Sequence, residues 1–238
     1  MLMQVPTHIS FIPDGNRRFA KRLMKTPWKG HKWGNEKLKD VFQWCTQAGV
    51  KVITIYALSL ENLTSRPKSE IEFLLSLAKK EANGILEDNG HFVHKSRVRV
   101  KFFGRLDLLP KDLCKVFRKA ELRTKHYSSH FLNFAIAYGG RQELVEASRR
   151  IAVKIAGGKL DPVDVDESTV RENLQTNGHP DPDLIIRTGG EKRLSNFLLF
   201  QSAYSELAFT DTFWPALTKK ELMSILKDFG GRERRFGK

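Results

Sequence analysis

Seven residues near the start of the chain, Ile12-Pro-Asp-Gly-Asn-Arg-Arg18, place one carboxylate among cations and turn-forming residues. The apolar run His8 to Ile12 ends in this turn, and a basic, helix-permissive segment follows. Such a junction directs backbone N–H groups and a helix N-terminus at one point, which favours phosphate binding. Asp14 would then suit a Mg²⁺ ion lying between the protein and a diphosphate. The simpler alternative is that Asp14-Gly15 only forms a turn.

A second stretch with phosphate chemistry runs from Arg187 to Ser195 and contains Arg193 and a Gly-Gly turn. Guanidinium groups grip phosphate oxygens with two hydrogen bonds, and glycines let the backbone approach closely. We therefore predict a phosphate site here, the alternative being a solvated basic loop.

Glu206 is an acidic residue within the mostly apolar run Ala203 to Leu207. We interpret it as a second Mg²⁺ carboxylate that accompanies Asp14, because Mg²⁺ is usually held by one or two carboxylates plus substrate phosphates. The alternative is an ordinary exposed helix residue.

The composition limits the class of protein and of partner. The chain has 238 residues, 40% of them hydrophobic and 29% charged, which suits one soluble domain spanning residues 1–238. Its net charge of +14 indicates an anionic partner: nucleic acid, an acidic membrane surface or a phosphorylated substrate. The spacings typical of P-loop NTPases, Rossmann dehydrogenases and zinc enzymes are missing from the sequence.

The two cysteines, Cys45 and Cys114, fall inside helical patterns, and we expect free thiols in a reducing compartment. The segment Met1 to Thr7 has no secretory signal pattern, and no run approaches the ~18 apolar residues of a membrane span. We expect a cytoplasmic protein that could still work at a membrane surface.

Strand and helix patterns alternate along the chain, which predicts an α/β fold with a central, mostly parallel sheet flanked by helices. Strands are expected at 8–12, 51–58, 98–102, 131–137, 183–187 and 197–200, and a basic loop at 25–32. The polar turns PDGN, SLEN, YGGR and RTGG follow the carboxyl ends of expected strands, the edge at which open α/β sheets bind ligands.

A long helix is expected to begin at Pro67, and its apolar face is wider than one sheet contact needs. That face is either deeply packed or lines an apolar cavity.

Taken together, these stretches resemble the cis-prenyltransferase family, typified by undecaprenyl diphosphate synthase. The matching segments occur in family order over nearly the whole chain: HISFIPDGNRRFAK, Gly30-His31, YALSLEN…RP, NFAIAYGGRQELVEA, DLIIRTGGEKRLSNFLLFQSAYSELAF and RERRFG. The resemblance implies the family's α/β fold with an apolar tunnel, walled in part by the helix after Pro67.

The resemblance also implies roles for individual residues. Asp14 and Glu206 would hold Mg²⁺, while Ser59 and Asn62 would lie beside the reacting centre as catalytic residues. Isopentenyl diphosphate would be bound through Arg187, Arg193 and Ser195. The diphosphate of an allylic prenyl primer would be bound by a larger group: Gly15, Asn16, Arg17, Arg18, His31 and Arg66.

The chain departs from the bacterial pattern at the primer site. Leu63 replaces an aromatic, an extra residue precedes Arg66-Pro67, and Pro27 stands where an arginine is expected. We expect Arg17 to supply the lost charge. These changes favour a primer longer than farnesyl diphosphate, such as geranylgeranyl diphosphate, or a shorter product.

The resemblance further implies a dimer, with itself or with another chain, in which the terminal Arg234–Gly237 region reaches the neighbouring site. Three alternatives stay open: a prenyltransferase using a different acceptor or linkage, a catalytically idle partner subunit, and a basic nucleic-acid-binding module. Interleaved aromatics for base stacking are not evident, so we expect no nucleic-acid partner.

Overall fold

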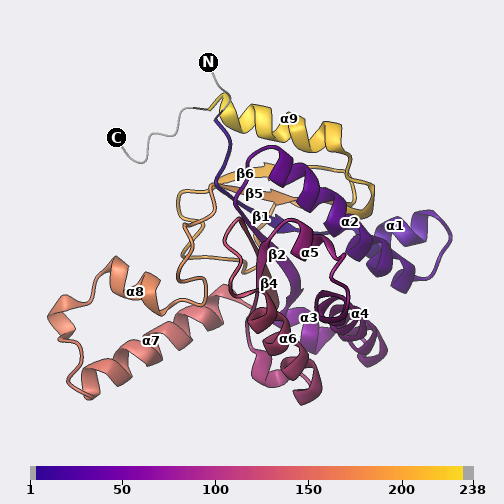
Figure 1. The fold of residues 1–238 in the computed structure, drawn as a ribbon. Helices are drawn as coiled ribbons and strands as arrows, with labels where there is room; N and C mark the ends of the chain where they lie inside the picture. Colours follow the sequence, from indigo (N-terminus) through magenta and orange to yellow (C-terminus); the bar gives the residue numbers. More distant parts are fainter. Residues whose placement is uncertain (1–3, 233–238) are drawn as a thin grey trace.

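A computed structural model describes residues 4–232 of the chain, and its centre is one sheet of six parallel strands (Figure 1). The strand order is β3-β4-β2-β1-β5-β6. The strands are β1 (His8–Ile12), β2 (Val52–Ser59), β3 (Val98–Phe103), β4 (His130–Tyr138), β5 (Leu184–Arg187) and β6 (Glu206–Phe209). The predicted α/β class with a parallel sheet is confirmed.

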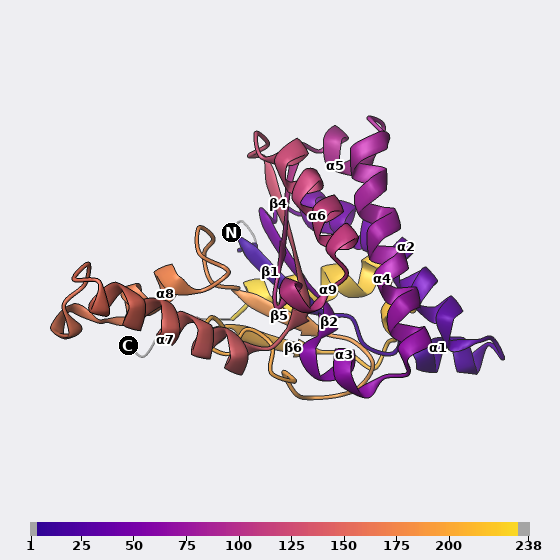
Figure 2. The same ribbon diagram turned by 90° about the horizontal axis from the view of Figure 1, so that it is seen from below.

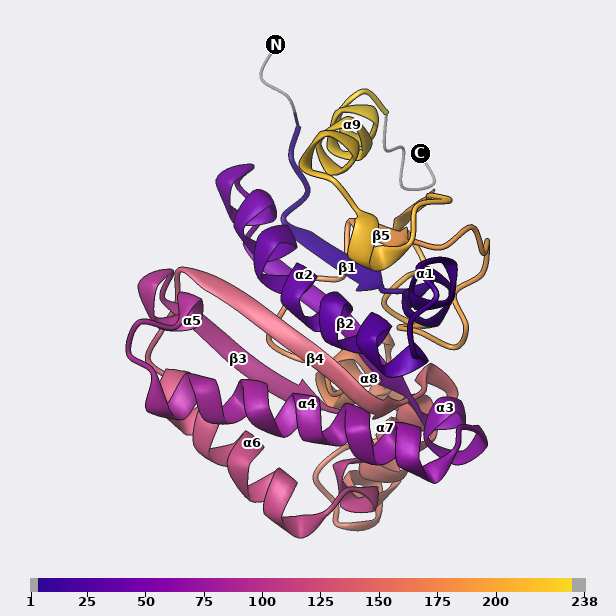
Figure 3. The same ribbon diagram turned by 90° about the vertical axis from the view of Figure 1, so that its right-hand side faces the viewer.

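The α-helices are α1 (Asn16–Arg22), α2 (Pro27–Gln47), α3 (Leu60–Ser65), α4 (Lys68–Glu87), α5 (Phe92–Lys95), α6 (Lys111–Thr124), α7 (Gly140–Ala156), α8 (Glu167–Asn173) and α9 (Lys219–Gly230). Figure 3 shows α2, α4 and α6 lying across one face of the sheet. Figure 2 shows the α7–α8 pair extending away from the sheet. In the described residues, no helix is long and apolar enough to cross a membrane.

The main core lies between the sheet and helices α2, α4, α6 and α9. Each helix contributes an apolar stripe at helical spacing, as with Leu38, Val41, Phe42 and Cys45 on α2. α4 begins directly after Pro67, whose fixed φ suits a helix start. Its buried residues Ile71, Ala82 and Ile85 share one side of the helix and pack in this layer.

The order in which strands are added to the sheet reverses beside β1, which pairs with β2 on one side and with β5 on the other. Ile12 stands opposite Arg187, so the turn after β1 and the turn after β5 emerge side by side. In open α/β sheets, a crevice for ligands forms where neighbouring strands lead to opposite sides. The topology therefore places the two predicted phosphate stretches together.

Two local expectations differ from the structure. The predicted loop at 25–32 is the first part of α2, which begins at Pro27 with Thr26 as its N-cap. The predicted strand at 197–200 is irregular, because Asn196 and Leu198 adopt left-handed conformations and the segment fills a small apolar cluster. The sixth strand is instead β6, which begins at Glu206.

Cys45 and Cys114 are free thiols, as expected.

A buried polar group, His8, joins the sheet to the segment before β5. Its Nδ1 donates to the Pro180 carbonyl at 2.7 Å, so its Nε2, 2.8 Å from Thr54 Oγ1, is left to accept. Burial lowers the pKa of His8 to about 4. The folded protein therefore holds this imidazole neutral.

The neutral His8 makes stability depend on pH. The folded-state pKa lies below the ordinary value of 6.5, so the unfolded chain binds the proton more tightly and stability falls as the pH drops from 6.5 towards 4. We expect His8→Gln to reduce this loss by about 2.5 kcal/mol, measured by urea unfolding at pH 7.5 and pH 4.5. His179, whose charge helps to lower the pKa of His8, is present in both proteins, so the difference reports the removal of His8. Equal pH slopes for both would contradict this account.

Candidate active site

The turn after β1 depends on the conformation of Gly15. Its φ of 94° is left-handed, and a Cβ there would lie 2.4 Å from Cδ1 of Phe213. Asn16 then begins α1, and its carbonyl and side chain pack against Gly30 and Gly34 of α2, where a Cβ would lie within about 2 Å of Asn16 oxygens. The turn is therefore held between α2 and the side chain of Phe213, at the edge of the sheet.

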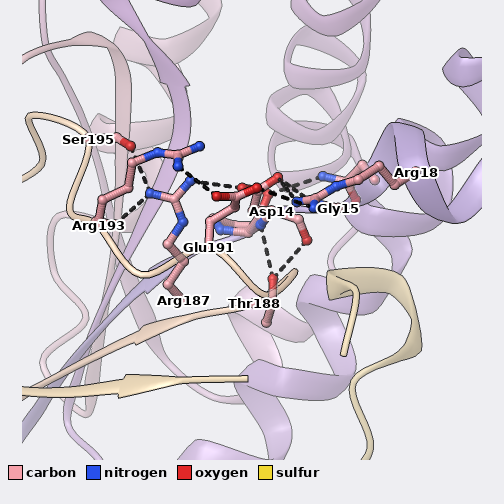
Figure 4. Close-up of polar contacts among 10 residues, drawn as sticks. Asp14, Gly15, Arg18, Arg187, Thr188, Glu191, Arg193 and Ser195 are labelled. Carbon is pink, nitrogen blue, oxygen red and sulfur yellow. Dashed lines mark hydrogen bonds and ion pairs between the residues drawn. The ribbon is translucent and has the colours of Figure 1, made fainter. Parts of the chain in front are cut away.

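Asp14 is the centre of the polar contacts at this edge (Figure 4). Its Oδ2 accepts from Arg187 Nη2 at 2.8 Å, and its Oδ1 accepts from the Gly15 N–H at 2.6 Å. Arg18 Nη2 lies 3.1 Å from Oδ1. The main chain of Asp14 is held by Thr188 Oγ1, which lies 2.9 Å from both its N and its O. The carboxylate is thus fixed between cations that come from β5 and α1.

These contacts decide the charge of Asp14. Burial alone would raise the pKa of its carboxyl, but hydrogen bonds from Arg187 and Gly15 and the charges of Arg187 and Arg18 bring it below the ordinary value of 3.8. Asp14 is therefore an anion at neutral pH, as a metal ligand must be.

Arg187 organises the second phosphate stretch. It is 5% exposed, and its Nη1 donates to Ser195 Oγ at 2.7 Å and to the Arg193 carbonyl at 2.5 Å. Arg193 itself is mostly exposed and pairs with Glu191 at 2.6 Å. Figure 4 shows Arg187 and Arg193 on one side of Asp14 and Arg18 on the other. The predicted grouping of Arg187, Arg193 and Ser195 is present.

Glu70 contacts three further basic residues of the site, and it was not among the residues that we predicted from the sequence. It is 3% exposed at the start of α4. Its Oε1 lies 2.9 Å from Arg66 Nη1 and 3.0 Å from His31 Nε2, while Arg17 lies 3.6 Å from Oε2. Burial lowers the pKa of His31, partly offset by Glu70. The detectable signal was an acidic residue in the first turn of a helix that follows Arg66-Pro67.

Two open clefts share Asp14, Asn16, His31 and Arg66. One, of about 470 Å³, also carries the cations of α1 and is lined by Gly15, Arg17, Arg18, Lys21 and Lys25. The other, of about 560 Å³, is lined further by Ser59, Asn62, Arg187, Arg193 and Ser195. Each is large enough for a small anionic ligand. The two predicted sets of phosphate-binding residues therefore line neighbouring clefts.

Ser59 and Asn62 reach the second cleft through the short helix α3. Ser59 caps this helix, and its Oγ accepts from the Asn62 N–H at 3.0 Å. Leu63, also predicted to contact substrate, is instead partly buried against the main apolar cluster and lines neither cleft.

Asn196, which was also not predicted from the sequence, connects the loop after Ser195 to α3 and α7. Its Nδ2 donates to Glu61 at 2.7 Å and to Gln142 at 3.1 Å, and its carbonyl accepts from the Gly140 N–H.

An apolar cavity of about 140 Å³ continues from the second cleft, with which it shares His31 and Leu74 in its lining. Its walls come from α2, α4 and the sheet, including Leu77, Ile85 and Phe134. The wide apolar face of α4 therefore lines a cavity, and is not only packed core.

Glu206 does not lie beside Asp14. It begins β6 opposite Leu184, at the amino end of β5, whereas Asp14 follows the carboxyl end of β1. The two ends are separated by three residues of strand, roughly 10 Å. Glu206 pairs with Arg232 at 2.5 Å instead. Within one chain, the expected joint Mg²⁺ site of Asp14 and Glu206 is therefore not formed.

The donor set at the edge nevertheless fits a magnesium ion bound mainly by substrate. In residues 4–232, no three His, Cys, Asp or Glu side chains cluster as a complete metal site. Asp14 offers an ionised carboxylate in the lining of both clefts. Mg²⁺ commonly takes one or two carboxylates and completes its shell with phosphate oxygens and water.

Comparison with known proteins gives consistent results. Residues 12–237 match a family model described as "Putative undecaprenyl diphosphate synthase". The chain is 49% identical over 235 residues to a "tritrans,polycis-undecaprenyl-diphosphate synthase (geranylgeranyl-diphosphate specific)" from Methanopyrus kandleri, covering 99% of this chain and 86% of the relative.

Two solved structures share the fold. A lavandulyl diphosphate synthase from Lavandula x intermedia, in complex with dimethylallyl diphosphate, has a TM-score of 0.92 at 35% identity, covering 98% of this chain and 99% of that chain. A probable undecaprenyl diphosphate synthase from Campylobacter jejuni has a TM-score of 0.80 at 33% identity, covering 99% of this chain and 100% of the other.

The crowding at Gly15 gives a test of the turn. Gly178 has nearly the same φ, 93° against 94°, but nothing lies within 4 Å of a Cβ there. Gly178→Ala therefore has only the cost of a left-handed alanine, whereas Gly15→Ala adds the contact with Phe213. We expect Gly15→Ala to lower the free energy of unfolding by about 1–3 kcal/mol more than Gly178→Ala in urea titrations. Equal losses would mean that the Phe213 segment does not constrain the turn.

Proposed function

The chain belongs to the cis-prenyltransferase family, and we propose that it condenses isopentenyl diphosphate with an allylic all-trans prenyl diphosphate. The product would be a long-chain polyprenyl diphosphate of mixed Z,E geometry, a precursor of glycosyl carrier lipids. The observation that carries this proposal is the arrangement of the two cationic clefts, which share Asp14 and open onto an apolar cavity. Two diphosphates and one hydrocarbon tail are the ligands that such an arrangement fits.

The allylic diphosphate would occupy the cleft beside α1. Gly15 and Asn16 lie in the lining of this cleft, while Arg17, Arg18 and Arg66 offer positive charge. Negative charge grows on the diphosphate as its allylic C–O bond breaks, so groups already held in place stabilise the transition state. Glu70 acts here as a positioning residue, because it holds Arg66 and His31 at the cleft.

The diphosphate of isopentenyl diphosphate would bind Arg187, Arg193 and Ser195 in the second cleft. Its double bond then attacks the allylic cation, and loss of a proton from the adduct forms the new Z double bond. Ser59 and Asn62 line the same cleft and are placed to orient the reacting centre. Asp14 would hold Mg²⁺, which when bound supplies positive charge to the leaving diphosphate.

Geranylgeranyl diphosphate is the primer that we favour. The Methanopyrus kandleri relative is named as specific for geranylgeranyl diphosphate. Pro27, which lines the cleft beside α1, stands where the bacterial pattern has an arginine, so this chain departs from bacterial members at the primer site. Farnesyl diphosphate is the alternative primer.

A second candidate uses the same scaffold with a different acceptor or linkage. A solved structure with the same fold is named a lavandulyl diphosphate synthase and not a polyprenyl one, so the fold alone does not determine the product. Analysis of the products from labelled isopentenyl diphosphate separates the two candidates, because only the first gives stepwise chain elongation.

We also propose a dimer in the cytoplasm with peripheral contact to a membrane for product release. The extended α7 carries the exposed residues Val145 and Val153, 50% and 72% exposed, which a second subunit could cover. The terminal Arg234–Gly237 region, proposed to reach the neighbouring site, lies outside the described residues.

Incubation with labelled isopentenyl diphosphate, Mg²⁺ and all-trans primers of ten to twenty carbons tests the function. We expect stepwise elongation by the wild type, and Asp14→Ala to reduce the rate by at least about a hundredfold with the fold intact by circular dichroism. Asp40→Ala, which removes an exposed carboxylate of α2, is the control. A normal rate for Asp14→Ala would refute the metal role, and no elongation by the wild type would refute the function.

The cavity makes a separate prediction about product length. Leu77 lies in its lining on α4, so truncation enlarges the space for the tail. We expect Leu77→Ala, and to a smaller extent Leu74→Ala, to shift the product distribution to longer chains on chromatographic separation. Unchanged distributions for both variants would show that the growing tail does not contact this face of α4.

A further inference from the structure

The apolar cavity has one carboxylate in its wall. Along α4, the lining residues Leu74, Leu77, Ala78, Glu81 and Ile85 recur at helical spacing, and all but Glu81 are apolar. Glu81 lies about two turns beyond Leu74, which also lines the second cleft, and this corresponds to roughly 10 Å along the helix. A carboxylate thus interrupts the apolar wall of the cavity beyond the second cleft.

Two neighbours hold Glu81 in this place. Asn35, on the facing helix α2, donates from Nδ2 to Oε2 at 3.3 Å, and it also lines the cavity. His91, just before α5, lies 3.1 Å from Oε1 through its Nε2. Burial alone would raise the pKa of Glu81, but the hydrogen bonds from His91 and Asn35 lower it below its usual value. The carboxylate is therefore ionised at neutral pH and fixed across the space between α2 and α4.

An ionised carboxylate resists contact with hydrocarbon. The Glu81 side chain keeps 29% of its surface accessible, and each oxygen has acceptor capacity beyond its one protein partner. A prenyl tail that reaches this level must displace water from the carboxylate, a cost that the leucines on the same face do not impose. Short tails end above Glu81, and longer tails must pass it.

We propose that Glu81, held by Asn35 and His91, determines product length by opposing further growth once the tail reaches its level in the cavity. This inference rests on the proposed function, since it requires a tail that grows in this cavity. It assigns specificity to a residue that contacts the tail, far from the atoms that react.

The test compares product distributions of Glu81→Leu, Glu81→Gln and wild type, using labelled isopentenyl diphosphate, geranylgeranyl diphosphate and Mg²⁺. We expect the main product of Glu81→Leu to be longer by at least one five-carbon unit. Glu81→Gln should shift in the same direction by less, because it removes the charge and keeps the shape. Glu72→Leu, on the outward face of α4 with 65% of its side chain exposed, should leave the distribution unchanged.

The outcomes separate the inference from the proposed function. If wild type elongates normally and both Glu81 variants give its distribution, or give shorter or merely broader ones, the inference is wrong. If Glu81→Leu does not fold, Glu81→Gln decides alone. If wild type incorporates no isopentenyl diphosphate with any primer, the proposed function fails instead.

Discussion

The contact between Asp14 and Arg187 is the interaction on which the site depends. It joins the turn after β1 to the end of β5, and β1 and β5 are adjacent parallel strands. Arg187 is almost fully buried and in turn fixes Ser195 and the Arg193 carbonyl. A buried guanidinium needs a carboxylate nearby, so this contact holds the linings of both clefts together at the sheet edge.

The sequence predicted those parts of the site that consist of glycine-containing turns at the ends of strands. Gly15 and the Gly189-Gly190 pair have positive φ, and each turn follows a strand of a parallel sheet, so their convergence follows from strand order. Neighbours distant in sequence were harder to predict. Glu70 is recognisable as a cation acceptor only when α4 is placed against α2, and Asn196 only when its loop is placed against α7.

The failures have a common physical origin, because short apolar segments do not reveal what they pack against. The apolar side chain of Phe197 stacks on the ring of Tyr56, with 4.4 Å between the ring centroids, and does not belong to a strand. The strand is β6, whose residues are only partly buried. Its register places Glu206 at the amino end of the sheet, and the apolar run 203–207 did not reveal that a strand begins at this residue.

Gly30 and Gly34 have a consequence for which parts of this site can change shape. They bring α2 so close to Asn16 that even a methyl group at either position would collide with it, so the head-group end of the site tolerates almost no change in shape. The face of α4 below it consists of separate side chains around an open cavity, and each can be exchanged without moving the backbone. Side-chain exchanges along α4 therefore alter the depth and width of the cavity while the turn that carries Asp14 keeps its shape.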